Sequence, residues 1–278
     1  YKGLLDNQVL STWRLKPLTA VAPSEVRAWA ARLVSTASVS TAGNALGLLR
    51  QSLDAVVAEG HLARNPADKV RLPKLARSEP APLTHAQLWS LVEAARDERD
   101  KVLLLVLGYG GMRWSEVVAL RIGDVKDGGR RLRLSEAAVQ VGGRIEVGTL
   151  KDHKARTVVL PQIVADRLKK WIRGRHADAL VFASSRGTYL HNQNWRRDVL
   201  TPAADSLGLT ITPHNLRDTA ATLEIAAGAS VTAVARMLGH ENPATTLKYY
   251  AGCFPDDLES ITDRLDGFAR QARNETEE

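Results

Sequence analysis

The chain has 278 residues, of which 44% are hydrophobic and 25% charged, and this composition excludes wholesale disorder and allows two domains. Lysine and arginine outnumber the acidic residues by 38 to 31, so a formal net charge of +7 favours a polyanionic partner. The sequence has neither an apolar run long enough to span a bilayer nor a signal-peptide layout, and we expect a cytoplasmic protein with no membrane partner.

The amino-terminal part has the apolar spacing of helices. Ser24, as an N-cap, predicts a helix over residues 25–33, and a further helix is predicted over residues 40–59. We therefore predict a small helical domain over residues 1–63. Because the chain begins at Tyr1 rather than at a methionine, we expect it to be a fragment of a longer protein.

Residues 64–82 break the helical pattern and form a basic segment punctuated by prolines. Its cations are Arg64, Lys69, Arg71, Lys74 and Arg77, and its prolines are Pro66, Pro73, Pro80 and Pro82. Two interpretations of this segment stay open. It is either a strap that follows a phosphate backbone or a solvated connector between two domains.

Residues 83–278 predict a second, larger domain in which helices surround a small sheet. After the N-cap Thr84, the predicted helices cover residues 85–95, 101–109, 116–120, 163–173, 192–205 and 257–272. The predicted strands cover residues 131–134, 138–141, 145–150 and 157–160. The predicted fold class is therefore mainly α with a small antiparallel sheet, that is, α+β.

A stretch near the carboxyl end has the features of an anion site. Thr212 is a good N-cap and Pro213 suits the first helical position, so His214 and Arg217 are predicted to lie at i, i+3 on one face of a helix. Unpaired backbone N–H groups and the helix dipole favour an anion at such a terminus. We expect that anion to be a phosphate.

The next apolar helix is predicted to stop at Gly239, which places His240 on the turn that follows, and two adjacent tyrosines close the stretch. Neither a cysteine nor a carboxylate lies at the spacing needed to act as a third ligand beside the two histidines, so we predict no metal site. The single cysteine, Cys253, excludes an internal disulfide, and we interpret it as a packing residue rather than a nucleophile.

These motifs recur in one family. They are His-x-Leu-Arg at 214–217, Leu-Gly-His at 238–240 and a tyrosine about ten residues on, preceded by Gly-Gly-Met-Arg-Trp-Ser-Glu at 110–116, Thr-Leu-Lys at 149–151 and Arg-Thr-Val-Val-Leu at 156–160. In this order and spacing, the sequence resembles the tyrosine recombinase (phage integrase) family. The run over residues 246–258 is most similar to integrases of actinobacterial phages.

The resemblance implies a site that cleaves phosphodiesters. Arg113 and Arg217 would clamp the scissile phosphate, Tyr250 would attack it, and Lys151 would protonate the departing 5′ oxygen. Lys154 lies on the same turn, but the Thr-x-Lys spacing favours Lys151. The resulting 3′-phosphotyrosine bond could be reversed by a second 5′-hydroxyl, so strand exchange would need neither a cofactor nor a metal.

The two histidines have secondary roles in this resemblance. His214 would act in proton transfer, and His240 would hydrogen-bond the phosphate or position the tyrosine. The sequence also departs from the family pattern at two places. Asp218 stands where the family commonly has His, which puts a secondary contact in doubt, and Pro243 stands where many members have another residue.

Tyr249 and Tyr250 compete for the role of nucleophile. They lie nine and ten residues after His240, and both spacings occur in the family. The relatives' Tyr-Ala-x-x-Phe-Pro sequence begins here at Tyr250, whereas an alignment of the double threonine at 245–246 favours Tyr249. The two side chains differ by about 100° around a helix, so only one can face the phosphate. We predict Tyr250.

The resemblance also implies the partners. The domain over residues 1–63 corresponds to a core-binding domain, the domain over 83–278 to the catalytic domain, and the substrate to double-stranded DNA at core crossover sites. The last helix, over residues 257–272, would dock in trans and link four protomers on two DNA sites through a Holliday junction, although packing in cis stays open. A host DNA-bending or directionality factor is a further possible partner.

We therefore predict a site-specific recombinase that integrates or excises phage DNA in the cytoplasm of a bacterial host. Two other classes share some of these features. A noncatalytic DNA-binding relative would keep the arginines for positioning, but the intact tyrosine counts against it. A type IB topoisomerase-like enzyme shares the chemistry, but the small helical domain and the short chain argue against it.

Overall fold

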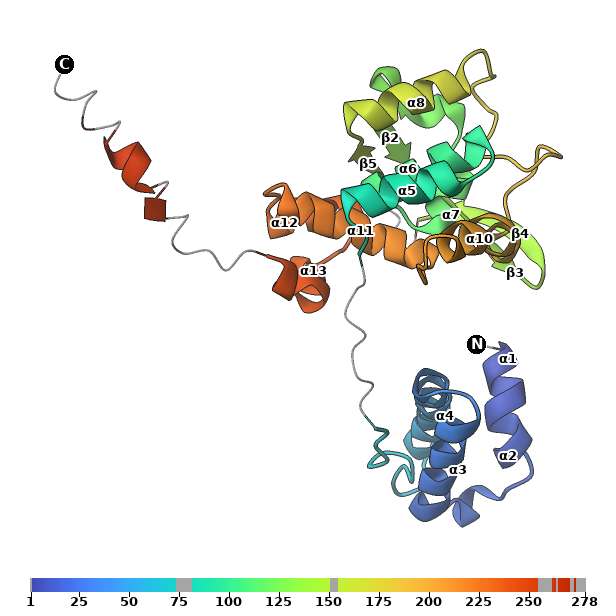
Figure 1. Ribbon diagram of the computed structural model, residues 1–278. Helices are drawn as coiled ribbons and strands as arrows, with labels where there is room; N and C mark the ends of the chain where they lie inside the picture. Colours follow the sequence, from blue (N-terminus) through green and yellow to red (C-terminus); the bar gives the residue numbers. More distant parts are fainter. Residues whose placement is uncertain are drawn as a thin grey trace. The chain divides into compact units, whose positions relative to one another are not determined.

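The computed structural model describes residues 2–73, 82–150, 155–254, 262–263, 265–270 and 273 (Figure 1). The chain divides into two compact units, Tyr1–Ser78 and Glu79–Glu278, and each is described here by itself. The larger unit combines helices with antiparallel strands, so the predicted fold class, α+β, is confirmed. No helix among the described residues is both long enough and apolar enough to cross a membrane.

The smaller unit is helical. Its elements are α1 (Lys2–Leu4), η1 (Leu5–Leu10), α2 (Ser11–Trp13), η2 (Leu18–Ala20), α3 (Pro23–Thr36) and α4 (Val39–Ala58). The first helix after η2 begins at Pro23, one residue before the predicted cap Ser24, because proline suits the first helical position. The carboxylate of Glu25 caps this helix by accepting the backbone N–H of Ala22 at 3.2 Å. Ser38 caps α4 by accepting the N–H of Thr41.

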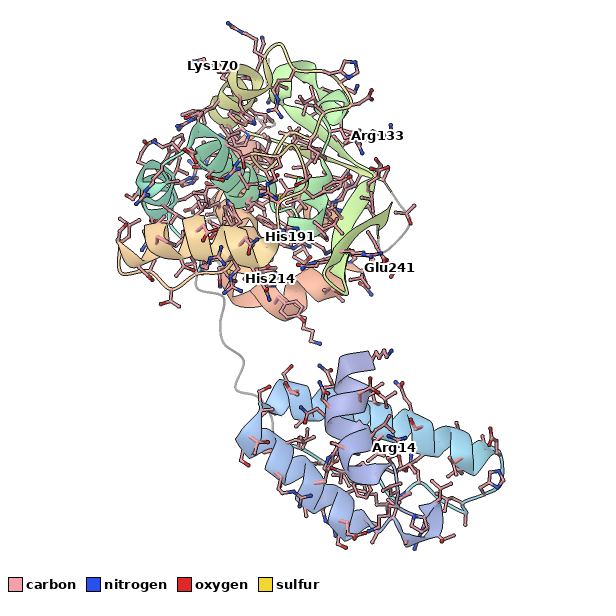
Figure 2. All side chains as sticks on the ribbon, turned by 90° about the vertical axis from the view of Figure 1, so that its right-hand side faces the viewer. Arg14, Arg133, Lys170, His191, His214 and Glu241 are labelled. Atoms are coloured by element: carbon pink, nitrogen blue, oxygen red, sulfur yellow. The ribbon has the colours of Figure 1, made fainter. Side chains whose placement is uncertain are left out.

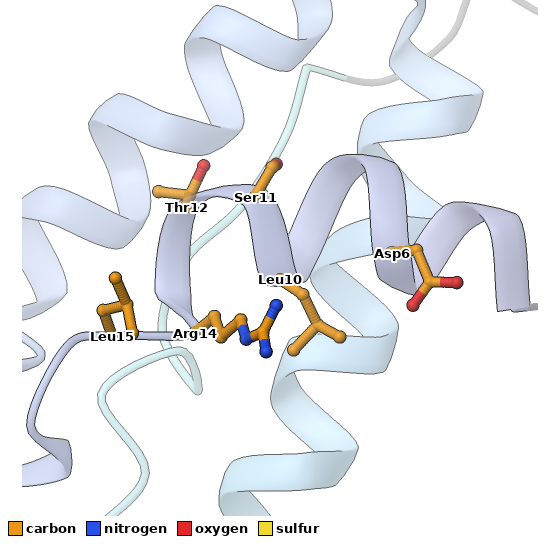
Figure 3. A pocket seen from close by; sticks show the side chains of 6 residues that line it. All are labelled: Asp6, Leu10, Ser11, Thr12, Arg14 and Leu15. Carbon is orange, nitrogen blue, oxygen red and sulfur yellow. The ribbon is translucent and has the colours of Figure 1, made fainter.

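The core of this unit lies between α3 and α4. Its buried residues are Val9, Val26, Trp29, Ala30, Leu33, Ala42, Ala45, Leu46, Leu49, Leu53, Ala67 and Val70. The indole N–H of Trp29 donates to the carbonyl of Gln8 at 3.2 Å and thereby ties α3 to the amino-terminal helical segment. A shallow hollow beside that segment is lined by Asp6, Leu10, Ser11, Thr12, Arg14 and Leu15 (Figure 3).

Part of the segment predicted as a linker is folded onto the helical unit. The Arg50 guanidinium, on α4, donates to the carbonyls of Ala67 and Val70, and the Asn65 amide donates to the Arg50 carbonyl and to Asp54. Ala67 and Val70 are themselves buried, because they complete the core that α3 and α4 leave open. The predicted linker therefore starts too early at residue 64. Residues 74–81 lie outside the described residues.

The larger unit is built mostly from helices. They are α5 (His85–Ala94), α6 (Glu98–Gly110), α7 (Trp114–Ala119), α8 (Gln162–Ile172), α9 (Asn192–Trp195), α10 (Thr201–Asp205), α11 (Pro213–Ala226), α12 (Val231–Leu238) and α13 (Pro243–Tyr250), with the short turns η3 (Ile122–Asp124), η4 (Asp127–Gly129), η5 (Arg196–Leu200) and η6 (Ala251–Cys253). The helix predicted over residues 192–205 is realised as α9, η5 and α10 in succession. Only part of the helix predicted over 257–272 falls within the described residues.

The strands form two small sheets among the described residues, where the sequence predicts one. β1 (Val125–Lys126), β2 (Arg131–Leu134) and β5 (Arg156–Val159) form one antiparallel sheet in the order β1-β2-β5. β3 (Glu136–Val141) and β4 (Arg144–Thr149) form a separate hairpin in which Val141 pairs with Arg144. β2 has both of its edges occupied, by β1 and by β5, and the β3–β4 hairpin that lies between β2 and β5 in the chain pairs with itself as a second sheet.

Helix α6 lies at the centre of the larger unit. It packs against α5, α8 and α11 (Figure 1), and every side chain from Val102 to Leu107 is fully buried. Gly108 permits the close approach of α5, because a Cβ at this position would lie 2.7 Å from the side chain of Leu88. The consequence is that α11, which carries two predicted site residues, is held against a rigid apolar helix.

A buried carboxylate joins α6 to α9. Asp100 is 1% exposed and accepts hydrogen bonds from the Arg99 guanidinium at 3.0 and 2.9 Å and from the Trp195 indole at 2.9 Å. Asp100→Ala should lower the free energy of unfolding by about 2–4 kcal/mol, because it leaves a buried donor and a partly buried cation unpaired. Chemical denaturation measures this loss.

A double-mutant cycle checks the mechanism of that loss. In a Trp195→Phe background, the indole donor is already absent, so Asp100→Ala should cost less than it does in the wild-type chain. An equal cost in both backgrounds would show that the hydrogen bond from Trp195 does not contribute.

Candidate active site

The amino terminus of α11 has the cap that the sequence predicts. The Thr212 hydroxyl accepts the N–H of Asn215, the Asn215 side chain accepts the N–H of Thr212 at 2.8 Å, and Pro213 occupies the first turn. His214 therefore lies on the first turn of the helix, at the edge of the larger unit (Figure 2), and its side chain is 76% exposed. Arg217, one turn later, is only 3% exposed and so lies inside the unit.

The ends of two other helices hold the Arg217 guanidinium. Nη1 donates to the carbonyl of Gly111 at 2.5 Å, and Nη2 donates to the carbonyl of Leu238 at 2.6 Å. Carbonyls at helix carboxyl termini carry partial negative charge, which suits a buried cation. Burial, together with the nearby charge of Arg113, lowers the pKa of Arg217 to about 10, so the side chain stays charged at neutral pH.

A buried carboxylate, Glu116, organises the other cations. Its two oxygens accept a bidentate pair of hydrogen bonds from Arg156 at 2.9 and 2.6 Å. It also accepts Nη1 of Arg113 at 2.9 Å and the backbone N–H of Arg113 at 2.8 Å. Burial favours a higher pKa for Glu116, but the hydrogen bonds and charge of Arg156, with those of Arg113, outweigh it and hold the pKa below its ordinary value. Glu116 is therefore ionised, and it fixes two guanidiniums.

Arg113 is the most accessible of the three arginines in this group. Its side chain is 37% exposed, and its second terminal nitrogen lies 3.5 Å from the carbonyl of Gly239. The family resemblance implies that Arg113 contacts a phosphate. The structure pairs Arg113 with Glu116 and leaves part of its guanidinium exposed, where an anion can reach it.

Arg156 joins this group, although the sequence marked it only as part of a strand motif. Its Nε donates to the carbonyl of Met237 at 3.1 Å, so the start of β5 is bound to the end of α12. Gly239 allows this contact, because it has a φ of +66° and a Cβ here would lie 2.9 Å from the Arg156 guanidinium. The sequence signal available for this contact was Glu116, an acidic residue three positions after Arg113, which accepts the Arg156 guanidinium in the structure.

His240 lies on the turn after α12, as the sequence predicts. Its Nδ1 lies 2.9 Å from the hydroxyl of Thr246, which is fully buried on α13. Burial lowers the pKa of His240 to about 4, and the charges of Arg217 and Arg113 act in the same direction. The imidazole is therefore neutral near pH 7. When it accepts the Thr246 hydroxyl at Nδ1, its proton lies on Nε2 and is available to an anion.

The two tyrosines of α13 have opposite environments. Tyr250 is 3% exposed, and its hydroxyl donates to Oδ1 of Asp218 at 2.5 Å. Burial and the neighbouring carboxylate of Asp218 raise the pKa of Tyr250. Tyr249 is 56% exposed, and the Lys248 amine lies 5.9 Å from its ring centroid. Only Tyr250 therefore faces the interior that contains Arg217.

The surroundings of Asp218 could not be predicted from the sequence. It departs from the family pattern, and the structure places it, 8% exposed, between Tyr250 and His214. The predicted acid Lys151 and its alternative Lys154 lie outside the described residues. The remaining site residues Arg113, His214, Arg217, His240 and Tyr250 gather where α11, α12 and α13 meet the start of α7. Cys253 is exposed.

The described residues contain no group of three His, Cys, Asp or Glu side chains that could hold a metal ion. The positive charge of the site instead comes from three guanidiniums that approach the ends of α6 and α12. Such an arrangement can bind an anion and stabilise charge that develops on it. A tyrosine hydroxyl buried beside it is a group that can act as a nucleophile.

Comparison with known proteins identifies the class of this site. Residues 82–254 match the model of the Phage integrase family. The chain belongs to this family. It is 31% identical over 255 residues to tyrosine recombinase XerC of Mycobacterium tuberculosis, covering 84% of this chain and 79% of that protein. It is 29% identical over 237 residues to XerC of Vibrio cholerae, covering 80% and 72%. The protein is thus a recombinase, an enzyme that breaks and rejoins DNA strands.

Solved structures of other integrases share the fold. The Tn1549 transposon integrase in complex with transposon right end DNA matches with a TM-score of 0.81 and 21% identity, over 95% of this chain and 92% of that one. A lambda integrase tetramer bound to a Holliday junction matches with a TM-score of 0.66 and 18% identity, over 87% and 72%. The predicted closeness to integrases of actinobacterial phages stays a prediction.

The contact between Gly239 and Arg156 predicts a substitution effect. Gly239→Ala should lower the free energy of unfolding more than Gly228→Ala, because both glycines have positive φ but only Gly239 also adjoins the Arg156 guanidinium. Gly228→Ala is the matched control, and backbone strain alone should lower its free energy of unfolding by about 1–2 kcal/mol. Denaturant unfolding measures both losses. Equal losses would show that Arg156 moves aside without cost.

The lowered pKa of His240 predicts a pH effect on stability. The folded-state pKa of about 4 lies below the ordinary value of 6.5, so the stabilisation is complete above about pH 6.5 and is lost as the pH falls toward 4. Between pH 7 and pH 5, the wild-type chain should lose up to about 2 kcal/mol more than His240→Gln does. Urea unfolding at both pH values measures this difference. Parallel losses in the two proteins would contradict the assignment.

Proposed function

We propose that this recombinase cleaves DNA through Tyr250, which attacks a phosphodiester held by Arg113 and Arg217 and forms a 3′-phosphotyrosine bond. One observation carries the assignment. The Tyr250 hydroxyl is buried and bonded to Asp218, the residue next to Arg217 on α11, whereas Tyr249 projects into solvent.

The arginines suit the charge that develops on the phosphate. The two hydrogen bonds of Arg217 to carbonyls use two of the five N–H donors of a guanidinium, so others remain for phosphate oxygens. Because the fold already holds the charge in place, little reorganisation is needed in the transition state. His240, neutral and bonded to Thr246, would add a donor to a nonbridging oxygen. Lys151 is proposed as the acid that protonates the departing 5′ oxygen.

The covalent bond explains how strands can be exchanged without an external energy source. Attack forms the bond between phosphorus and the tyrosine oxygen and breaks the bond between phosphorus and the 5′ oxygen. The energy of the phosphodiester is retained in the phosphotyrosine, so the 5′-hydroxyl of a second duplex can reverse the step. Strand exchange between two duplexes then passes through a Holliday junction. We propose no metal and no nucleotide cofactor.

The assembly follows from this reaction, since two duplexes must be held at once. We propose four protomers on two core crossover sites, with the helical unit, which extends beyond the predicted boundary at residue 63 to include residues 65–70, as the core-binding domain and residues 83–278 as the catalytic domain. Leu265 and Phe268, near the carboxyl end, are 62% and 68% exposed, which supports docking of this segment on a neighbouring protomer. The lambda integrase neighbour is a tetramer bound to a Holliday junction.

We further propose that the reaction is the integration or excision of phage DNA in the cytoplasm of a bacterial host, aided by a host DNA-bending or directionality factor. The excess of basic residues, 38 against 31 acidic ones, supports DNA as the partner. A noncatalytic relative or a topoisomerase-like enzyme would differ in measurable ways. The first forms no covalent adduct, and the second relaxes supercoiled DNA without joining two sites.

Substitution of each tyrosine tests the proposal. The wild-type chain is incubated with a pool of nicked duplexes of random sequence, and the DNA that stays attached to denatured protein is sequenced to define a substrate. On that duplex, Tyr250→Phe should form no adduct, because the attacking oxygen is gone, whereas Tyr249→Phe should form it at a rate close to that of the wild-type chain.

The binding control uses the same duplex. Both variants should bind it as tightly as the wild-type chain does, because neither substitution removes a cation. An adduct formed by Tyr250→Phe and lost in Tyr249→Phe would move the nucleophile to Tyr249. No adduct with any of the proteins, despite tight binding, would favour the noncatalytic class.

A further inference from the structure

Tyr250 has an unusually close polar partner for a buried hydroxyl. The distance of 2.5 Å between its oxygen and Oδ1 of Asp218 is at the short end for a hydroxyl that donates to a carboxylate. Both residues are buried, at 3% and 8% exposure. The hydroxyl proton of Tyr250 therefore already points at a group that can accept it.

The same carboxylate oxygen has a second neighbour. Nε2 of His214 lies 4.0 Å from Oδ1 of Asp218, and the His214 side chain is 76% exposed. The three groups thus form a chain of neighbours, from a buried phenol through a buried carboxylate to an imidazole in contact with solvent. A proton that reaches Asp218 has an exit that does not cross the arginines.

We propose that Asp218 is a further catalytic residue, the general base that takes the Tyr250 proton during attack, with His214 as the outlet for that proton. This inference rests on the proposed role of Tyr250 as nucleophile. In the step, the O–H bond of Tyr250 breaks as its oxygen bonds phosphorus. The bond from phosphorus to the 5′ oxygen breaks, and its electron pair leaves on that oxygen, which the general acid protonates. In the reverse step, Asp218 returns a proton to the phenolate.

The surroundings of the phenol leave Asp218 as the acceptor. The charged and titratable groups that act on Tyr250 are Asp218 and Arg217 from α11 and Cys253 from η6. Arg217 stays protonated near pH 7, and burial raises the pKa of Tyr250, so the phenol does not ionise by itself at that pH. A base in contact with the reacting oxygen speeds such a step by about 10²–10⁴-fold.

Asp218→Asn tests the proposal in the full chain. Asparagine can still accept the Tyr250 hydrogen bond, but it cannot take the proton. Adduct formation at pH 7 should slow by about 10²–10⁴-fold while duplex binding stays unchanged, and the rate should rise with pH as hydroxide replaces the base. Asp218→Glu, which keeps a carboxylate, should restore part of the rate at pH 7. His214→Gln should slow the reaction less than Asp218→Asn.

A modified substrate separates the base from the acid. When sulfur replaces the bridging 5′ oxygen, the leaving thiolate needs no protonation, but the tyrosine must still lose its proton. The ratio of the Asp218→Asn rate to the wild-type rate should therefore be the same on the sulfur and oxygen duplexes. A ratio that returns to one on the sulfur duplex would assign Asp218 to the leaving group and overturn the proposal.

Two further outcomes have distinct meanings. If Asp218→Asn forms the adduct as fast as the wild-type chain or faster, Asp218 only accepts the Tyr250 hydrogen bond in the resting enzyme, and the proposal is wrong. A variant that fails to fold is recognised by its thermal unfolding curve, and Asp218→Glu then supplies the test, since an unchanged pH profile together with a lost rate would overturn the base role. An adduct formed by Tyr250→Phe would instead overturn the proposed function itself.

Discussion

The site depends on one buried carboxylate. Glu116 is 2% exposed, yet it stays ionised because Arg156 and Arg113 surround it with four hydrogen bonds. Burying a charge is costly unless it is paired in good geometry, and here the pairing joins the start of α7 to the start of β5. Without Glu116, two guanidiniums would face Arg217 with no compensating charge. The carboxylate therefore permits three cations to lie close together.

The remaining compensation comes from helix ends. Gly111 closes α6 and Leu238 ends α12, and their carbonyls accept the two bonds of Arg217. Gly239, in the left-handed conformation that ends α12, admits the Arg156 guanidinium beside it. Two helices that end at the same place thus supply the partial negative charge that holds the cations before any substrate arrives. The arrangement is costly to change, because each carbonyl serves the helix cap and the site together.

Tyr250, the proposed nucleophile, is held by the same helix that carries Arg217. Arg217 and Asp218 are adjacent on α11, so the residue proposed to bind phosphate and the residue that accepts the Tyr250 hydroxyl belong to one helix. Tyr250 also packs in an apolar cluster with α11 and α12, which limits its rotamers and orients the oxygen. Rigid support of this kind is what a displacement at phosphorus requires, because most of its catalysis comes from position and charge.

The sequence by itself determined the local structure and the family. The caps at Thr84 and Thr212 and the stop at Gly239 could be predicted because each depends on residues within one helical turn. The pairing of the strands in two sheets, the folding of residues 65–70 onto α4, the bonds of Arg156 and the partner of Tyr250 were decided only by the tertiary structure. Arg156 meets Glu116 across 40 residues and Arg217 meets Gly111 across 106, and at such separations only the packing of helices against a common core decides which side chains come together.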